Sequence, residues 1–533
     1  MKKKQEKCKK PNETFTKIVE TYIYMNIIFI FTKEEFFMNK LTLRENTNNF
    51  LTYTRNVKGI TLIALVVTIV VLLILAGITI NMLFSNGGIF KTAQDAANAW
   101  DEASVNEQES LNNLADQIGN LVNGQGGGTI TPEEPEKPET TPADGSFSEE
   151  KGVNTPDLAD GALTPVKWEE EPKGSGTYTM VTTTADDPEW YSYTVADKKW
   201  ANAITSDGSM WVWVPRYAYQ IADNYHTNSE TGGTINIKFM KGATNEAADG
   251  TKTWDNASGQ GNWNIHPGFN YSSTASGIWV AKFEASRNNA TASNAGSENT
   301  IKIQPRVQSW RTVKISDAYT ICLNYNSNLN SHMMKNTEWG AVAYLAQSSY
   351  GKNAEVWINP NSNFLTGQAG SGPSVGSTTS TSAYNSGNGP QASSTGTVYG
   401  VYDMSGGAYE YTAAYVNNGN SNLTSNGASL VSGAAYTKDV YTKGSADDRP
   451  TNYAAAASKY GDAVYETSLS SNGTPNWNTS WYSDYSNFPY STNPFFIRGG
   501  FYNGASDAGL FCFNDVSGNA GSYYGFRPVL VAL

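Results

Sequence analysis

The sequence predicts an α+β domain that follows an N-terminal transmembrane helix and a linker rich in proline and glutamate. Three observations lead to this prediction. Residues 60–80 are an uncharged run of 21 residues, which is long enough to cross a bilayer as a helix. Residues 123–152 contain four prolines and many glutamates, and such a composition buries no core. From residue 153 onward, one helical pattern stands among short strand-like runs separated by loops rich in Gly, Ser and Asn.

The composition favours an exposed, loop-rich fold with an aromatic core. Only 16% of the 533 residues are charged, whereas 12% are aromatic, with 31 Tyr, 14 Trp and 49 Gly. The net charge of −12 argues against a nucleic-acid partner, because phosphate binding needs clustered Lys and Arg. The three cysteines show no short spacing, which excludes a zinc ribbon or a disulfide framework: Cys8, Cys322 and Cys512. The three histidines are far apart in sequence, so no helical pair of metal ligands is visible: His226, His266 and His332.

The N-terminal apolar run is predicted to be a single-pass membrane anchor. Four basic residues precede it, namely Lys40, Arg44, Arg55 and Lys58. By the positive-inside rule this flank stays in the cytoplasm, so we expect everything after residue 84 to lie outside the cell. A buried core helix is the alternative, but the length and the absence of charge disfavour it.

The junction Lys58-Gly59-Ile60 precedes the apolar helix directly and resembles the prepilin cleavage site of type IV pilin-like proteins. The resemblance implies cleavage after Gly59 and a mature chain that begins at Ile60. The fifth mature residue is Ala64, where that family usually has Glu for pairing with a neighbouring subunit. Simple membrane anchoring therefore stands beside assembly into a pilus or pseudopilus.

The remaining N-terminal segments are assigned by their composition. Residues 1–59 are a leader, of which 1–37 hold a second apolar patch and are expected not to be translated, because Met38 opens a more ordinary leader. Residues 60–84 are the transmembrane prepilin-type helix. Apolar residues at three- and four-residue steps predict a helical stalk over 85–122, and 123–152 are the linker.

The large domain, residues 153–533, is predicted to contain one long helix. Residues 336–351 place apolar side chains on one face behind a cap at Asn336 or Thr337. Strand-like runs occupy residues 210–221, 276–286 and 398–416, and the closing segment from residue 498 to the C-terminus.

Three motifs in this domain resemble the C-type-lectin-like fold of the formylglycine-generating enzyme (sulfatase-modifying factor) family. They are Thr-Glu-Trp at 337–339, Gly-Val-Tyr-Asp-Met-Ser-Gly-Gly-Ala-Tyr-Glu-Tyr at 400–411, and Arg-Gly-Gly at 498–500 with Gly-Phe-Arg at 525–527. The resemblance covers most of 153–533 and implies a structural role for Trp339, Asp403, Glu410, Arg498, Gly499, Gly500, Phe526 and Arg527.

The resemblance does not extend to a catalytic site. Oxidases of that family need two cysteines a few residues apart to hold copper, and Cys512 has no close partner in the sequence. The iron-dependent members need three clustered histidines, and calcium-dependent lectins need triplets that do not occur here. We therefore expect no enzyme activity, no catalytic residue and no cofactor. Calcium held by Asp403 and Glu410 is the one metal left open; the alternative is that they pair with backbone donors and arginines.

The two ends of the segment 498–528 contain residue types that commonly fix the backbone, whereas its middle is irregular in pattern. Glycines, arginines and a proline bracket aromatic and small polar residues that follow no helical or strand period. This arrangement resembles the variable proteins of diversity-generating retroelements, in which Asn codons near the C-terminal end of a lectin-like domain are rewritten. The resemblance implies a ligand site formed by Phe501, Tyr502, Asn503, Asp507, Phe511, Cys512, Asn514, Asp515, Val516, Ser522, Tyr523 and Tyr524.

The function that follows is a bacterial, surface-displayed binding protein of the adhesin or receptor type, with an unidentified protein or cell-surface ligand. Tyr with Ser, Asn and Gly is the composition of antibody-like binding loops. Three alternatives stay open: an ordinary loop whose aromatic side chains pack the interior, an enzyme or enzyme relic of the formylglycine-generating type, and a minor pilin in which the domain is a cap.

Overall fold

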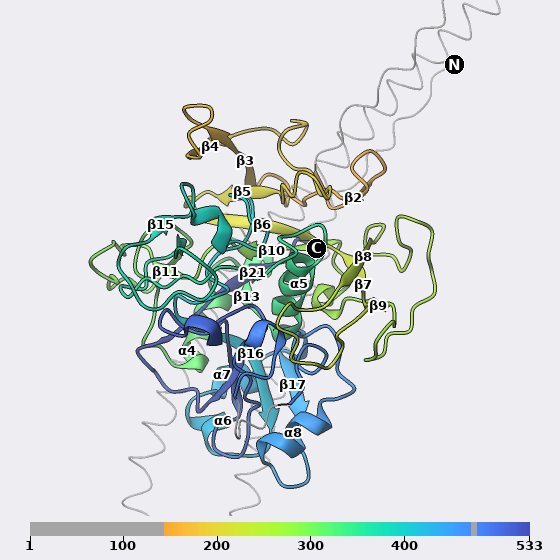
Figure 1. The fold of residues 1–533 in the computed structure, drawn as a ribbon, viewed down its shortest axis with the longest axis vertical. Coiled ribbons are helices and arrows are strands. Elements are labelled where there is room, and N and C mark those ends of the chain that lie inside the picture. Colours follow the sequence, from red (N-terminus) through yellow and green to blue (C-terminus); the bar gives the residue numbers. More distant parts are fainter. Residues whose placement is uncertain (1–142, 471–476) are drawn as a thin grey trace, which may run out of the picture. The chain divides into compact units, whose positions relative to one another are not determined.

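The structure, a computed structural model, describes residues 143–470 and 477–533 (Figure 1). The expected leader, transmembrane helix and stalk, the cleavage site at Gly59 and Ile60, and most of the linker lie outside the described residues. Within the described ranges, no helix has the length and apolar character needed to cross a membrane. The described part belongs to one compact unit that runs to the C-terminus.

The predicted α+β class is confirmed, since several sheets and α-helices build this unit. The largest sheet has seven strands in the order β13-β21-β10-β6-β5-β3-β4, and its described neighbours are antiparallel. Their bounds are β3 (Leu163–Glu170), β4 (Tyr178–Thr182), β5 (Asn202–Thr205), β6 (Met210–Pro215), β10 (Gly277–Ala281), β13 (His332–Met333) and β21 (Pro528–Leu530).

The centre of this sheet is covered on both faces. All five residues of β10 are buried, and β6 is buried from Trp211 to Pro215. Strands that are buried on both faces read as continuous apolar runs rather than as an alternation. Trp213 pairs with Trp279 across the two strands, with ring centroids 5.3 Å apart, so bulky aromatic rings form the middle of the core.

A second sheet has the order β17-β16-β18-β19, and β20 also pairs with β16. Its strands are β16 (Tyr409–Asn417), β17 (Asp439–Thr442), β18 (Phe495–Arg498), β19 (Phe513–Val516) and β20 (Tyr524–Phe526). The chain passes directly from β20 in this sheet to β21 in the large sheet, with only Arg527 between them. The closing segment therefore joins the two sheets, which lie one above the other in Figure 1.

Smaller sheets complete the β-structure. A three-stranded sheet has the order β8-β7-β9, and three strand pairs lie apart from it. The bounds are β7 (Tyr217–Ile221), β8 (Ile235–Phe239) and β9 (Asn264–Ile265); β1 (Phe147–Ser148) with β2 (Val153–Asn154); β11 (Ser286–Arg287) with β12 (Ile301–Lys302); and β14 (Gln368–Ala369) with β15 (Ser382–Ala383).

The predicted long helix is α5 (Asn336–Gln347), and its core residue Trp339 is fully buried. Its N-cap is Lys335 instead of Asn336 or Thr337. The Glu338 carboxylate accepts a hydrogen bond from the Lys335 backbone N–H at 2.9 Å, which closes the first turn. The helix ends at Gln347, four residues earlier than predicted, because Ser348 adopts extended backbone.

The sequence did not predict α4 (Ile315–Leu323), which packs against the short helix Ala428–Ser432 and against β13 of the large sheet. The remaining helices are short: α6 (Asn422–Ser425), α7 (Ala428–Ser432) and α8 (Arg449–Ala455). Single 3₁₀ turns are η1 (Pro267–Phe269), η2 (Ser327–Leu329), η3 (Gly389–Ala392), η4 (Ala435–Thr437), η5 (Trp481–Ser483) and η6 (Ala505–Asp507).

Three of the predicted strand runs and one boundary differ from the structure. Residues 276–286 form β10 only as far as Ala281, and Ser286 begins β11. Residues 210–221 form two strands in different sheets, and residues 398–408 are loop, so only β16 forms from 398–416. Asp403, Gly406 and Gly407 have φ of 61°, 77° and 69°, and such left-handed positions cannot continue a strand. The folded unit also includes residues 143–152, predicted as linker, because β1 pairs with β2.

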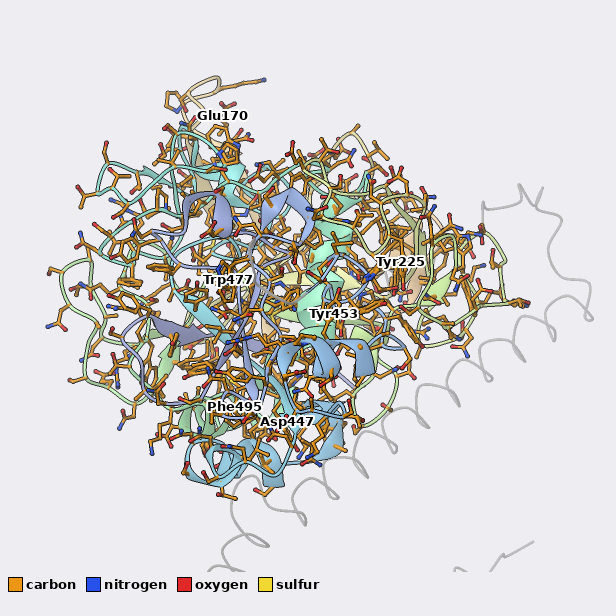
Figure 2. All side chains as sticks on the ribbon, turned by 60° about the horizontal axis from the view of Figure 1, so that its bottom comes forward. Glu170, Tyr225, Asp447, Tyr453, Trp477 and Phe495 are labelled. Carbon is orange, nitrogen blue, oxygen red and sulfur yellow. The ribbon has the colours of Figure 1, made fainter. Side chains whose placement is uncertain are left out.

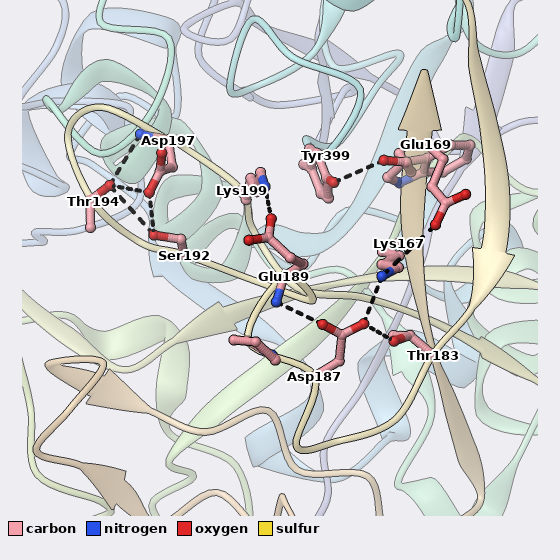
Figure 3. A network of polar contacts seen from close by, with 12 residues as sticks. Lys167, Glu169, Thr183, Asp187, Glu189, Ser192, Thr194, Asp197, Lys199 and Tyr399 are labelled. Carbon is pink, nitrogen blue, oxygen red and sulfur yellow. Dashed lines mark hydrogen bonds and ion pairs between the residues drawn. The ribbon is translucent and has the colours of Figure 1, made fainter. Parts of the chain in front are cut away.

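A polar network fastens the loop after β4 to the large sheet (Figure 3). Lys167 of β3 contacts Asp187 at 2.8 Å, and Glu189 contacts Lys199 at 2.9 Å. The hydrogen bond from Lys167, followed by that from Thr183, lowers the pKa of Asp187 to about 2. The network is partly exposed and its charges are paired with one another, which is typical of a solvated surface.

Candidate functional site

The two arginines of the bracketing motifs are buried hydrogen-bond centres. The Arg498 guanidinium donates to the carbonyl oxygens of Cys512 at 2.8 Å, Ala463 at 2.9 Å and Asp462 at 3.0 Å. Its Cζ lies 5.4 Å from the centre of the Trp339 ring, and the Trp339 indole N–H donates to the Leu510 carbonyl at 2.7 Å. Arg498 thus ties β18 and the helix α5 to the middle of the irregular segment.

Arg527 forms the second centre. Its Nε donates to Glu410 Oε2 at 3.0 Å and its Nη2 to Glu410 Oε1 at 2.5 Å, with both side chains buried. The other guanidinium contacts go to the carbonyl oxygens of Ala281 at 2.7 Å and Tyr402 at 2.8 Å. Because Ala281 belongs to β10 and Glu410 to β16, Arg527 connects the two sheets where the chain crosses between them.

The buried carboxylates do not fit a calcium ion. Asp403 Oδ1 accepts hydrogen bonds from Asn359 Nδ2 and from the Gly367 N–H, both at 2.8 Å, and both Glu410 oxygens are held by Arg527. Oxygens that already accept hydrogen bonds from cationic or N–H donors are poor ligands for a hard cation. Among the residues that the structure describes, no three His, Cys, Asp or Glu side chains come together in a way that could hold a metal ion.

Glycine is required at the start of the irregular segment. Gly499 and Gly500 have φ of 82° and 75°, where an L side chain is strained. A Cβ at Gly500 would also lie 2.5 Å from both Cα and Cβ of Ala508. The chain therefore reverses tightly at residues 499–500, and the residues that follow return to the surface.

Three aromatic residues from the start and end of the segment meet at this surface. The ring of Phe501 lies 5.4 Å from that of Tyr502 and 5.5 Å from that of Tyr523, measured between centroids. Phe501 also stacks on Tyr409 of β16 at 5.3 Å, and Tyr409 lies 6.3 Å from Tyr524. Phe501, Tyr502 and Tyr524 are half-buried, and Tyr523 is 47% exposed.

Phe364, from the loop between α5 and β14, lies beneath this group. Its ring is 4.7 Å from Tyr502 and 6.1 Å from Tyr523, and the residue is only 7% exposed. We use the term aromatic face for the six residues Phe364, Tyr409, Phe501, Tyr502, Tyr523 and Tyr524. Four of these belong to the predicted ligand site, and two come from outside the segment 498–528.

The polar residues of the predicted site divide between the surface and the interior. Asn503 and Ser522 are exposed, while Asp507 and Asn514 are half-buried. Asp507 accepts a hydrogen bond from Asn478 Nδ2 at 2.7 Å. Trp477, which directly precedes Asn478 in the sequence, is 40% exposed and is labelled in Figure 2. Its ring stacks on that of Tyr485, with centroids 5.8 Å apart.

Four residues predicted to project toward a ligand are instead buried. Phe511 packs against Trp481, with centroids 5.0 Å apart, and Val516 lies in β19. Asp515 accepts hydrogen bonds from Arg449 at 2.8 Å and from Asn487 and Asn493 at 2.6 Å. Cys512 is fully buried. These four residues of the predicted ligand site therefore belong to the interior of the domain, because Phe511 and Cys512 are enclosed directly before β19 and both faces of β19 are covered at Asp515 and Val516.

The two cysteines of the described domain and His266 are buried, and burial favours their uncharged forms. Cys322 and Cys512 are free, and burial raises the pKa of both thiols well above the ordinary range. Each is thus a neutral thiol, whereas copper and nucleophilic chemistry need the thiolate. Burial lowers the pKa of His266 to about 3, so this imidazole is uncharged.

A cleft of mixed polar and apolar lining runs along α4. One part, of ≈ 570 Å³, is lined by Arg287, Trp310 and Lys314 and reaches Ala520. An adjoining part, of ≈ 460 Å³, is lined by Asp207 and Tyr325, and the two share Asn299, Thr320 and Ile321. Its side chains carry both charges and pair mainly with neighbouring backbone and side-chain groups.

Comparison with known proteins leaves the site to be interpreted from its own geometry. No protein-family model matches the chain, and no curated protein is significantly similar to it.

Proposed function

We propose that the protein is a surface-displayed binding protein whose ligand site is the aromatic face, diversified by a retroelement. The domain is proposed to have a C-type-lectin-like fold of the formylglycine-generating type. The observation that carries the proposal is a division of labour within one segment. Its end residues Arg498 and Arg527 are buried hydrogen-bond centres, whereas the residues next to them gather in one partly exposed aromatic cluster.

This division favours a replaceable site. Phe501 and Tyr502 directly follow the fixed turn at Gly499–Gly500, and Tyr523 and Tyr524 directly precede the fixed residues at 525–527. The two ends of the segment are held together by pairing of both β18 and β20 with β16. Side chains at these positions can change while the backbone that presents them is held by other residues.

The composition of the aromatic face suits binding. Tyr and Phe side chains supply a large contact area at a small cost in conformational entropy, and exposed aromatic residues are frequent centres of binding energy. Asn503 and Ser522 add hydrogen-bonding groups at the rim. The N-terminal prepilin-like segment would place this face outside the cell, with or without a filament.

The experiment that tests the retroelement is sequencing of the DNA next to the gene. We expect a reverse transcriptase gene and a near-copy of codons 498–528 that differs from them mainly at adenines. The copy should predict substitutions at 501–503 and 522–524, and no change at Arg498, Gly499 or Arg527. A neighbourhood with neither feature would contradict diversification.

A further inference from the structure

Arg311 borders the aromatic face and comes from outside the segment 498–528. Its guanidinium Cζ lies 3.7 Å from the centre of the Phe364 ring, which is the ring beneath Tyr502 and Tyr523. Its Nη1 donates to the Ser522 carbonyl oxygen at 2.7 Å, in the middle of the predicted site. A cation over an aromatic ring is held in place by the ring's electron-rich face.

Among the described residues, protein groups take up only a small part of the hydrogen-bonding capacity of this guanidinium. A guanidinium has five N–H donors, and the hydrogen bond to Ser522 uses one of them. The Arg311 Nε is buried without a partner. Within residues 143–470 and 477–533, no carboxylate lies within ion-pair distance of it.

The carboxyl group that influences Arg311 most is that of Glu284, whose burial disfavours the ionised form that would pair with the guanidinium. Burial raises the pKa of Glu284 well above its usual range, and the carboxylates of Asp403 and Glu410 raise it further. These influences favour the protonated form of Glu284. Burial also lowers the pKa of Arg311, and Glu284 and Tyr502 offset this lowering only in part, so the cation is partly desolvated.

Arg449 provides a contrast in the same domain. Its guanidinium also lies over an aromatic ring, 4.0 Å from the centre of Tyr490, and is of similar exposure class. Unlike Arg311, it pairs with a carboxylate, that of Asp515, at 2.8 Å. A ligand carboxylate bound to Arg311 would reproduce the arrangement of the Arg449–Asp515 pair, in which a guanidinium lies over a ring and binds a carboxylate.

We propose that Arg311 is a fixed anchor for a carboxylate of the ligand, whose apolar part packs on Phe501, Tyr502 and Tyr523. This inference rests on the proposed function of the aromatic face and names its ligand class: an acidic group next to an aromatic or aliphatic group. The planar guanidinium suits a carboxylate, which it can bind through two parallel hydrogen bonds. Because Arg311 lies outside 498–528, every diversified version of the site would keep the anchor.

The test uses benzoate and benzamide, which share a ring and differ in charge. Their binding to the full-length chain is measured by saturation-transfer NMR, at low and high salt. We expect benzoate to bind at least about fivefold more tightly than benzamide, as for a charge-assisted hydrogen bond at a partly exposed site. Arg311→Gln should abolish the preference for benzoate, because it removes the positive charge. Arg311→Lys should retain part of the preference, because lysine keeps the charge but cannot form the two parallel hydrogen bonds of a guanidinium. Arg449→Gln is the matched control and should leave the preference unchanged.

The outcomes separate the inference from the proposed function. Added salt should weaken benzoate more than benzamide, because it screens the ion pair. If both compounds bind equally, and Tyr502→Ser with Tyr523→Ser abolishes both, the carboxylate anchor is refuted while the aromatic face remains the ligand site. If benzoate does not bind, or its binding survives Arg311→Gln in a variant that melts like the wild type, the inference is refuted. If benzoate binding survives the loss of both tyrosines, the proposed site itself is contradicted.

Discussion

Arg527 and Glu410 form a two-bond pair, at 2.5 Å and 3.0 Å, at the point where the chain crosses from one sheet to the other. Both side chains are buried, and two further Arg527 N–H groups donate to backbone carbonyl groups of β10 and of the loop before β16. A buried charge is costly unless it is paired and hydrogen-bonded. The crossing of the C-terminal segment from one sheet to the other therefore depends on the pairing of Arg527 with Glu410.

Glu410→Gln should destabilise the domain strongly, because it removes the carboxylate to which the buried Arg527 cation is directly hydrogen-bonded. The expected loss is about 3–5 kcal/mol of unfolding free energy, measured by urea denaturation. Lys252→Gln is the control, since Lys252 pairs with Glu246 at 2.7 Å on the surface and is 68% exposed. That variant should lose less than about 1 kcal/mol. Equal losses in the two variants would show that the buried pair has no special role.

Gly500→Ala tests the tight turn that begins the irregular segment. The variant combines an unfavourable φ of 75° with a Cβ placed 2.5 Å from Ala508. Gly152→Ala separates the two effects, because Gly152 has φ of 68° and a Cβ there meets nothing within 4 Å. We expect about 1 kcal/mol for Gly152→Ala and a clearly larger loss for Gly500→Ala, read from thermal or urea unfolding. Similar losses would mean that residues 500 and 508 are not in close contact.

Glu466 should make stability depend on pH near neutrality. Its Oε2 accepts hydrogen bonds from the hydroxyls of Tyr219 at 2.7 Å and Tyr344 at 2.9 Å, while its Oε1 is buried without a partner. Burial raises the pKa of Glu466 from the ordinary 4.5 to about 7. A folded-state pKa above the unfolded value gives stability that is complete below pH 4.5 and is lost as the pH rises to about 7.

The measurement for Glu466 is the unfolding free energy of wild type and Glu466→Gln at pH 5 and pH 7.5. Glutamine cannot ionise, so the wild type should lose about 2 kcal/mol more than the variant over this range. Other groups titrate in both proteins and cancel in the difference. Parallel pH profiles would show that Glu466 is already ionised at low pH.

The sequence predicted those parts of the fold whose residues carry a local physical signal. Gly499 and Gly500 indicated tight backbone, and both have positive φ; Trp339 was predicted on the apolar face of a helix that the structure contains. A similar signal was present for α4 and was missed. Ile315, Ala318, Tyr319 and Cys322 have helical spacing and are all buried, but the β-branched residues between them obscured the pattern.

The site was only partly predictable, because its membership depends on contacts distant in sequence. Phe364 and Arg311 reach the aromatic face through tertiary pairing, such as the hydrogen bond from the Ser309 N–H to the Phe364 carbonyl at 3.0 Å. Composition also could not separate exposed from buried positions within 501–524. Phe501 and Phe511 are the same residue type, yet only Phe511 is enclosed, by Trp481 and the pairing around β19.

The most direct test of the account is the stability of a variant with Tyr502, Tyr523 and Tyr524 all changed to Ser, compared with Phe511→Ser. Substitutions at partly exposed sites should cost about 1 kcal/mol each or less, whereas loss of one buried phenylalanine should cost about 3–5 kcal/mol. We predict that the triple variant unfolds cooperatively, only moderately below the wild type, and no earlier than Phe511→Ser. If the triple variant is unfolded at room temperature while Phe511→Ser is not, the three rings are core residues and the aromatic face is not a replaceable ligand site.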